Sequence, residues 1–249
     1  MNGHLVINFL ETVNAMSARD ITGLTIETRT EDGELVDKYV SNTTQLTIVP
    51  SPFFAQDIIT ASNETFTDTK FTFKLVLADV HEAGFYFEIH IPPEVGVPDS
   101  ITSESGYTVE ISGGTDTTSK DPYILKVSGF DSEMPSGKTM NLELDTLTTP
   151  KTTVSTRTFK IYSKDSLGRI INYVDSEFIL TMISGKNVGS AKIATTSPLV
   201  GDVSGLVLDF DTPVPIRPTD QIRIMFPDEV LPPYNIDGKC QGSNSLADL

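Results

Sequence analysis

Residues 85–95 read Phe-Tyr-Phe-Glu-Ile-His-Ile-Pro-Pro-Glu-Val, and this stretch decides the fold class. Its apolar residues Phe85, Phe87, Ile89 and Ile91 alternate with Tyr86, Glu88 and His90. Alternation with a period of two is typical of a β-strand that buries one face. The same pattern recurs in Phe71, Phe73, Leu75 and Leu77, and in Ile222, Ile224 and Phe226. Each of these runs is therefore predicted to be a strand.

Glycine-containing turn signals separate the alternating runs. They are Glu31–Gly33, Ser112–Gly114, Pro135–Gly137, Ser166–Gly168 and Asp237–Gly238. The best helix candidate, residues 12–19, is short and lacks an apolar stripe. Many short strands with no helical pattern between them predict an all-β sandwich.

The strand patterns come into phase when the chain is slid against itself by 135 positions. Residues 87–95 then fall on residues 222–230, and both end in a Pro-x-Glu-Val motif. Further matches at the same offset are Phe71 with Leu206, Phe73 with Leu208, Leu24 with Phe159, Ile26 with Ile161, Gly33 with Gly168, and Leu5, Ile7 and Phe9 with Met140, Leu142 and Leu144. The sequence thus predicts β-sandwich repeats with a period of about 135 residues.

This period divides the chain into three parts. Residues 1–51 match the back of a unit, residues 52–186 form a complete unit, and residues 187–249 match the front of another unit. A half sandwich exposes its inner face and an open strand edge. Two explanations remain open: a longer tandem chain, or completion of the partial units by other strands. For the second, residues 3–15 are a candidate donor strand, whose apolar side chains are Leu5, Ile7 and Phe9.

Composition excludes several classes of protein. The 249 residues include 18 Lys and Arg, 34 Asp and Glu and one Cys, for a formal charge of -16. Phosphate contacts need clustered basic residues, so nucleic acid and anionic membrane surfaces are not expected partners. We expect no membrane insertion, since no run of 18 apolar residues occurs, and the sequence opens without a recognisable secretory leader. One Cys rules out a disulfide scaffold within the chain.

Several motifs together resemble a known family. They are residues 135–142, Pro-Ser-Gly-Lys-Thr-Met-Asn-Leu, residues 147–150, Leu-Thr-Thr-Pro, residues 159–168, Phe-Lys-Ile-Tyr-Ser-Lys-Asp-Ser-Leu-Gly, and Phe226-Pro227. They resemble the tandem immunoglobulin-like repeats of very large surface proteins of ciliates and other protists. Cys240 stands where that family has a loop Cys, whereas Ser105 occupies the same place in the complete unit and Thr149-Pro150 replaces Asn-Pro. The resemblance implies an immunoglobulin-like fold and an extracellular or cell-surface setting.

No residue pattern predicts catalysis, a cofactor or a metal centre. His4, His81 and His90 lack a second ligand at metal spacing, and no nucleophile or phosphate-loop motif occurs. The acidic clusters Glu31-Asp32, Asp209/Asp211 and Asp228-Glu229 lack the spacing of a calcium loop, so a solvated surface is the default and a weak inter-domain calcium site the alternative.

Two kinds of modification site are predicted. Asn42-Thr43-Thr44 and Asn63-Glu64-Thr65 are N-glycosylation sequons in polar loops. Cys240 has no partner in the chain, so it is either a free thiol or a candidate for an intermolecular bond.

The sequence therefore favours a non-enzymatic, structural protein: a subunit or segment of an extracellular fibre that self-assembles from identical subunits by strand complementation. The alternative is a cell-surface adhesin or coat protein in which the repeats act as a spacer or binding module. A glycan-active enzyme is disfavoured, because no Trp and only 7 Tyr are available to stack on sugars.

Overall fold

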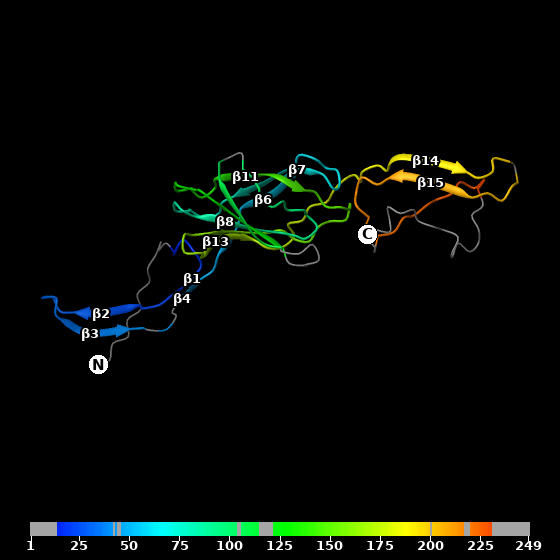
Figure 1. The fold of residues 1–249 in the computed structure, drawn as a ribbon. Helices are drawn as coiled ribbons and strands as arrows, with labels where there is room; N and C mark the ends of the chain where they lie inside the picture. Colours follow the sequence, from blue (N-terminus) through cyan, green and yellow to red (C-terminus); the bar gives the residue numbers. More distant parts are fainter. Residues whose placement is uncertain are drawn as a thin grey trace. The chain divides into compact units, whose positions relative to one another are not determined.

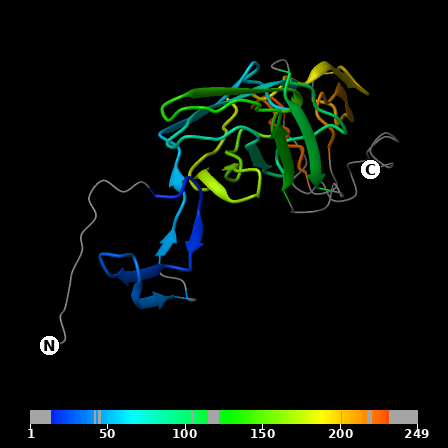
Figure 2. The ribbon, with the colours of Figure 1, turned by 90° about the vertical axis from the view of Figure 1, so that its left-hand side faces the viewer.

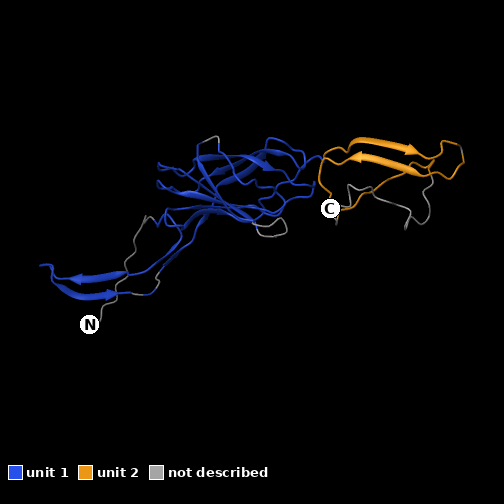
Figure 3. Cartoon of the chain, in the orientation of Figure 1, with its two compact units in different colours: residues 1–185 blue, residues 186–249 orange. Residues whose placement is uncertain are grey.

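The computed structural model describes residues 14–41, 43, 46–103, 106–114, 122–199, 201–216 and 220–230. In this part of the chain all regular structure is β, in fifteen strands, and no helix is present that could cross a membrane (Figure 1). The chain divides into two compact units, residues 1–185 and 186–249 (Figure 3). The all-β prediction is confirmed.

The larger sheet of unit 1 has six strands in the order β5-β13-β12-β8-β10-β9. Their bounds are β5 Ser51–Pro52, β8 Tyr86–Ile91, β9 Thr108–Gly113, β10 Tyr123–Ser128, β12 Lys160–Lys164 and β13 Ile170–Val174. All neighbours are antiparallel except β5, which runs parallel to β13. Thus β8, the strand in the stretch that decides the fold class, lies in the interior of this sheet.

The smaller sheet has three strands in the order β11-β7-β6. Their bounds are β6 Ala55–Thr60, β7 Asp68–Val76 and β11 Thr139–Thr148, and both pairings are antiparallel. The central strand, β7, carries the predicted alternation, since Phe71, Phe73 and Leu75 are fully buried while Lys74 between them is exposed.

The two sheets pack face to face as a sandwich, with β6, β7 and β11 in one layer and β8 and β13 in the other (Figure 1). The chain crosses between layers from β5 to β6, from β7 to β8, from β10 to β11 and from β11 to β12. Strands β6, β7 and β11 take the places of A, B and E of an immunoglobulin domain, and β8, β12 and β13 those of C, F and G. The fold is therefore an immunoglobulin-like sandwich.

Aromatic side chains from both sheets fill the core. The Phe73 ring meets the Phe159 ring edge-on, with centroids 5.8 Å apart. Phe130 stacks on Phe85 at 4.5 Å, and Phe53 lies 6.4 Å from Phe87. Phe53 is buried between β5 and β6, where the chain moves from the edge of the larger sheet into the smaller one. One continuous core therefore joins the two layers.

Three two-stranded ladders complete the described structure. In unit 1, β1 Arg19–Ile21 pairs with β4 Leu46–Ile48, and β2 Thr25–Arg29 pairs with β3 Leu35–Val40. Figure 2 shows β1 and β4 side by side. In unit 2, β14 Gly189–Thr195 pairs with β15 Leu206–Asp211.

One predicted strand is not formed. Residues 222–226 have no regular structure, and Ile222, Ile224 and Phe226 are exposed. The prediction was wrong for these residues in the isolated chain. Alternating sequence gives a strand only where another strand supplies hydrogen bonds, and no described residue pairs with this segment.

A matched pair of substitutions tests this difference in burial. Ile89→Ala should lower the free energy of unfolding of the sandwich by about 2–5 kcal/mol, because it leaves a cavity in a packed core. Ile224→Ala, at the position 135 residues later, should change it by less than about 0.5 kcal/mol in dilute solution. Urea denaturation followed by circular dichroism measures both. Equal losses would show that residues 222–226 belong to a packed core.

Candidate functional site

Most of the predicted site residues lie outside the described part of the chain. These are Leu5, Ile7, Phe9, Asn42 and Cys240, together with His4. Asn63 is described, and its side chain is exposed. Its carbonyl accepts hydrogen bonds from the backbone N–H groups of Ile183 (3.2 Å) and Ser184 (3.4 Å), so the backbone is anchored while the amide faces solvent.

His81 is the centre of a buried polar network that the sequence did not predict. Its Nε2 atom lies 2.7 Å from Ser163 Oγ, and its Nδ1 atom lies 2.9 Å from the Asp79 carbonyl. Ser163 Oγ accepts a hydrogen bond from the Asn172 N–H at 2.9 Å. The Asn172 side chain donates to Asp79 Oδ2 at 2.7 Å and accepts from the Ala78 N–H at 3.0 Å.

A His–Ser pair at this distance resembles a catalytic pair, but its surroundings differ. His81 and Ser163 are both 0% exposed, so no substrate reaches the hydroxyl. Each polar atom of the network instead satisfies a neighbouring strand or loop, which is what buried polar groups require. The network ties the loop after β7 to β12 and β13 and is a structural element.

His90 lies on the outer face of the larger sheet, away from this network. Its Nε2 atom is 2.9 Å from Glu88 Oε1, and Lys164 Nζ is 2.6 Å from Glu88 Oε2. Burial raises the pKa of Glu88, but the hydrogen bonds from Lys164 and His90 outweigh it and hold that pKa below its usual value. In the part of the chain described, no three His, Cys, Asp or Glu side chains are placed to hold a metal ion.

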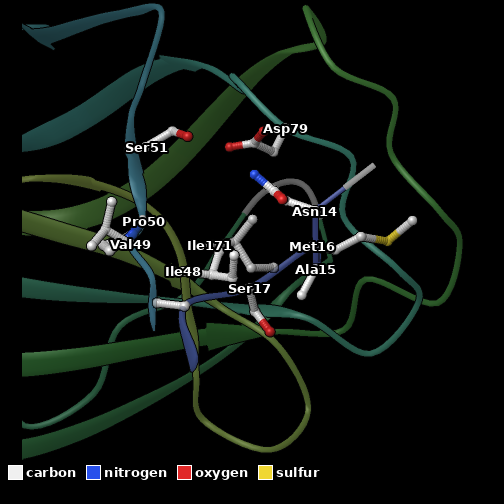
Figure 4. A pocket seen from close by; sticks show the side chains of 11 residues that line it. Asn14, Ala15, Met16, Ser17, Ile48, Val49, Pro50, Ser51, Asp79 and Ile171 are labelled. Carbon is white, nitrogen blue, oxygen red and sulfur yellow. The ribbon is translucent and has the colours of Figure 1, made fainter. Parts of the chain in front are cut away.

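A small cavity of about 130 Å³ lies where residues 14–18 and 48–51 meet the sandwich (Figure 4). Its polar lining residues are Asn14, Ser17, Ser51 and Asp79, and its apolar lining includes Ile48 and Ile171 (Figure 4). Binding sites for drug-sized molecules usually measure about 300–1,000 Å³. The cavity is thus too small for such a ligand.

Hydrogen bonds fix the segment that borders this cavity. The Ala18 N–H donates to the Ile170 carbonyl at 2.7 Å. Ser17 also bonds to the Asp165 carboxylate, which pairs with Arg169 at 2.7 Å. Burial raises the pKa of Asp165, but hydrogen bonds from Arg169, Ser17 and Leu167 more than offset it, so the pKa is lowered. The cavity therefore lies inside unit 1, between residues 14–18 and the sandwich.

The β2–β3 hairpin has the same register as the β12–β13 hairpin of the sandwich. β2–β3 pairs Ile26 with Tyr39, Glu27 with Lys38, Thr28 with Asp37 and, after a bulge, Arg29 with Leu35. β12–β13 pairs Ile161 with Val174, Tyr162 with Tyr173, Ser163 with Asn172 and, after a bulge, Lys164 with Ile170. Each number in the second set exceeds its counterpart by 135.

The turns of these hairpins also correspond. Gly33 and Gly168 have positive φ angles of 84° and 81°, which favour glycine. The Gly33 N–H donates to the Thr30 carbonyl at 3.0 Å, and the Gly168 N–H donates to the Asp165 carbonyl at 2.9 Å. The Asp37 N–H bonds to Thr28 Oγ1 at 3.0 Å, as the Asn172 N–H bonds to Ser163 Oγ.

The β14–β15 hairpin matches β6–β7 in the same way. β6–β7 pairs Asp57 with Lys74, Ile58 with Phe73, Ile59 with Thr72 and Thr60 with Phe71. β14–β15 pairs Lys192 with Asp209, Ile193 with Leu208, Ala194 with Val207 and Thr195 with Leu206, again at an offset of 135. Asp57 and Lys74 carry opposite charges, and so do Lys192 and Asp209, with the acidic and the basic residue exchanged between the two strands.

The two hairpins differ from their counterparts in the exposed fraction of their apolar side chains. Ile161 is 0% exposed, whereas Ile26 is 54% exposed. Phe71 and Phe159 are fully buried, whereas their counterparts Leu206 and Leu24 are exposed by 43% and 48%. Tyr39 and Ile193 are exposed on the same two faces, and their counterparts Val174 and Ile58 belong to the core or pack against it. Unlike scattered surface apolar residues, clustered ones mark an interaction surface. These two faces are the candidate functional site.

Comparisons with known proteins give two solved structures of low sequence identity. No protein-family model and no curated protein match the chain. An immunoglobulin-like protein from Nocardia farcinica matches with 14% identity and a TM-score of 0.36, over 51% of this chain and 96% of that one. A non-cellulosomal cohesin from Archaeoglobus fulgidus matches with 15% identity and a TM-score of 0.26, over 49% and 93%.

The buried network predicts a specific pH dependence. Burial lowers the pKa of His81 in the folded chain, so the unfolded chain binds a proton more readily. Stability is therefore full above the unfolded pKa of about 6.5 and falls as the pH drops below it. His81→Gln should reduce the free energy of unfolding at pH 7.5 by about 1–3 kcal/mol and flatten its decline towards pH 5.5.

The matched control is His90→Gln, which changes a histidine on the outer face of the sheet. Urea unfolding at pH 7.5 and pH 5.5 measures the decline for each protein. If His90→Gln flattens the curve and His81→Gln does not, the role assigned to the buried histidine is wrong.

The exposed amide of Asn63 leads to a separate expectation. When the chain is secreted from a eukaryotic host, Asn63 should carry an N-linked glycan, because its side chain faces solvent. Mass spectrometry before and after enzymatic deglycosylation checks this. Asn63→Gln should remove one glycan, and Asn42→Gln provides the comparison at the second sequon. Unmodified Asn63 in the secreted protein would contradict the expectation.

Proposed function

We propose that this protein is a structural subunit or segment of an extracellular filament assembled from immunoglobulin-like sandwiches. One observation carries the proposal: the two exposed hairpins repeat the pairing of buried hairpins in the same chain. The β2–β3 hairpin matches the last two strands of the sandwich, and β14–β15 matches its first antiparallel pair. Each has the strand pairing of a half sandwich, and no strand that the structure describes covers its apolar face.

Burial of the exposed faces supplies the driving force for assembly. An apolar side chain of this size contributes roughly 1.5–3 kcal/mol when it moves from water into a core. Leu24, Ile26 and Tyr39 on one hairpin and Ile193 and Leu206 on the other are exposed. Even after the entropic cost of association, several such side chains support a stable contact.

Strand complementation extends this contact to the N-terminal residues. At the offset of 135, Leu5, Ile7 and Phe9 correspond to Met140, Leu142 and Leu144 of β11. In the sandwich these three residues pair with Leu75, Phe73 and Phe71 of β7. The N-terminal segment of one subunit would thus supply the strand next to β15 of another, in the manner of donor-strand pilus subunits.

The resemblance to surface-protein repeats supports the extracellular setting, as do the two sequons. Thr149 and Pro150, which depart from the family's Asn-Pro motif, lie directly after β11. An acidic surface with a formal charge of -16 keeps a β-rich subunit soluble before assembly. The protein would act by its shape and contacts, without a cofactor.

Electron cryo-microscopy of the full chain, with sedimentation over a range of concentrations, tests the function. We expect regular filaments that grow with protein concentration. Replacing Leu5, Ile7 and Phe9 with Ser should shift assembly to at least tenfold higher concentration, because it removes the apolar side chains of the donor strand. The matched control replaces the alternate residues Val6 and Asn8 with Ser and should assemble normally.

Two results would overturn the proposal. One is a chain that stays monomeric at all concentrations and is unaffected by removal of residues 1–15. The other is discrete particles with closed sandwiches, which would favour the cell-surface adhesin or coat protein.

A further inference from the structure

We propose that β2 of one subunit pairs with residues 221–225 of a second copy, in the antiparallel register that joins β12 to β8. This inference rests on the proposed function and names the contact. In the sandwich, β12 has β13 on one side and β8 on the other. β2 has only β3 as a partner among the described residues, and no described strand pairs with the edge that corresponds to the β8 side of β12.

The register follows from the sandwich. β12–β8 pairs Lys160 with His90, Ile161 with Ile89, Tyr162 with Glu88, Ser163 with Phe87 and Lys164 with Tyr86. At the offset of 135, the pairs between copies are Thr25 with Met225, Ile26 with Ile224, Glu27 with Arg223, Thr28 with Ile222 and Arg29 with Gln221. Residues 221–225 have no strand partner in the described chain, so their backbone groups are free of a ladder.

The apolar face agrees with this register. Ile26 and Ile224 stand directly opposite each other and correspond to Ile161 and Ile89, both of which are completely buried. In the isolated chain Ile26 is 54% and Ile224 49% exposed. The pairing therefore places both side chains on the inner face of a completed sandwich.

The contact between the two layers of the sandwich predicts a second apolar contact between the copies. In the sandwich, the Phe159 ring meets the Phe73 ring. The counterparts of these two residues are Leu24, next to β2, and Leu208, in β15. Leu24 of one copy would thus meet Leu208 of the next across the new core.

The outer face adds charge complementarity. Glu27 and Arg223 are directly opposite in the proposed register, and both are outward-facing positions. Opposite charges across a strand pair stabilise it, whereas like charges destabilise it. Lys38 and Arg29 already hold the Glu27 carboxylate ionised, since their hydrogen bonds lower its pKa. A one-residue slip would place Glu27 against Ile222 or Ile224, which disfavours other registers.

A polar contact completes the match. The Asn172 side chain accepts hydrogen bonds from the Ala78 and Asp79 N–H groups at 3.0 and 3.4 Å. Asp37 corresponds to Asn172, and Pro213 and Val214 correspond to Ala78 and Asp79. Proline has no N–H, so the Asp37 carboxylate would accept the single remaining donor, the Val214 N–H of the second copy.

Disulfide trapping between single-cysteine proteins tests the register. In a Cys240→Ser background, Glu27→Cys is mixed with Arg223→Cys, and Arg29→Cys with Gln221→Cys, under mild oxidation. Residues directly opposite are close enough for a disulfide, because their Cα atoms lie about 4.5–5.5 Å apart. The crossed mixtures, 27 with 221 and 29 with 223, are matched controls at diagonal positions about 7–8 Å apart. Any product is a link between two copies, because each protein has one thiol.

We expect matched mixtures to form covalent dimers at least tenfold faster than crossed mixtures, which would support the proposed pairing. Filaments without this preference would overturn the β2 pairing and leave the proposed function standing. A chain that neither assembles nor cross-links would overturn both. Mixing Glu27→Arg with wild type should weaken association, and Glu27→Arg with Arg223→Glu in one chain should restore it.

Discussion

A β-sheet with an apolar face is stable only when another layer covers that face, and in this all-β chain the layer is a second sheet. Between Ser51 and Val174 this requirement is met, because Phe73 from one layer and Phe159 from the other close a continuous core. The hairpins β2–β3 and β14–β15 have the same pairings as their counterparts, but no strand in the described part of the chain covers them. Their backbone conformation is therefore set by local pairing, and their burial depends on contacts that each hairpin lacks.

Inside the sandwich, buried polar groups join the strands and loops by hydrogen bonds. The His81–Ser163–Asn172 network joins three segments that are distant in the sequence, and it satisfies loop N–H groups that would otherwise be buried without partners. The β2–β3 hairpin keeps only the portion of this network that lies within two strands, the Thr28–Asp37 bond. The polar interior is thus a property of the assembled sandwich, whereas hairpin geometry is a property of the local sequence.

The sequence could predict what depends on short-range pattern. The alternation in residues 71–77 and 85–91 correctly predicted strands with buried Phe and Ile side chains. The turns at Gly33 and Gly168 lie where the sequence has glycine between two alternating runs. It could not predict that residues 222–226 lack strand structure, since alternation does not say whether a neighbouring strand exists. Nor could it predict the His81 network, because Ser163 and Asn172 approach His81 only through strand pairing. The 135-residue period remains a prediction that the matching registers support.

The two exposed hairpins are different surfaces, because β2–β3 corresponds to the end of the sandwich and β14–β15 to its beginning. A two-fold axis would bring β2–β3 of each copy against β14–β15 of the other, and this closed dimer would leave no hairpin to add a third copy. The proposed filament instead needs head-to-tail contacts that do not close, so that every added copy leaves one hairpin of each kind unused. An array built in this way has polarity: its two tips present different chemistry, and blocking one tip with an isolated half unit leaves growth at the other unaffected.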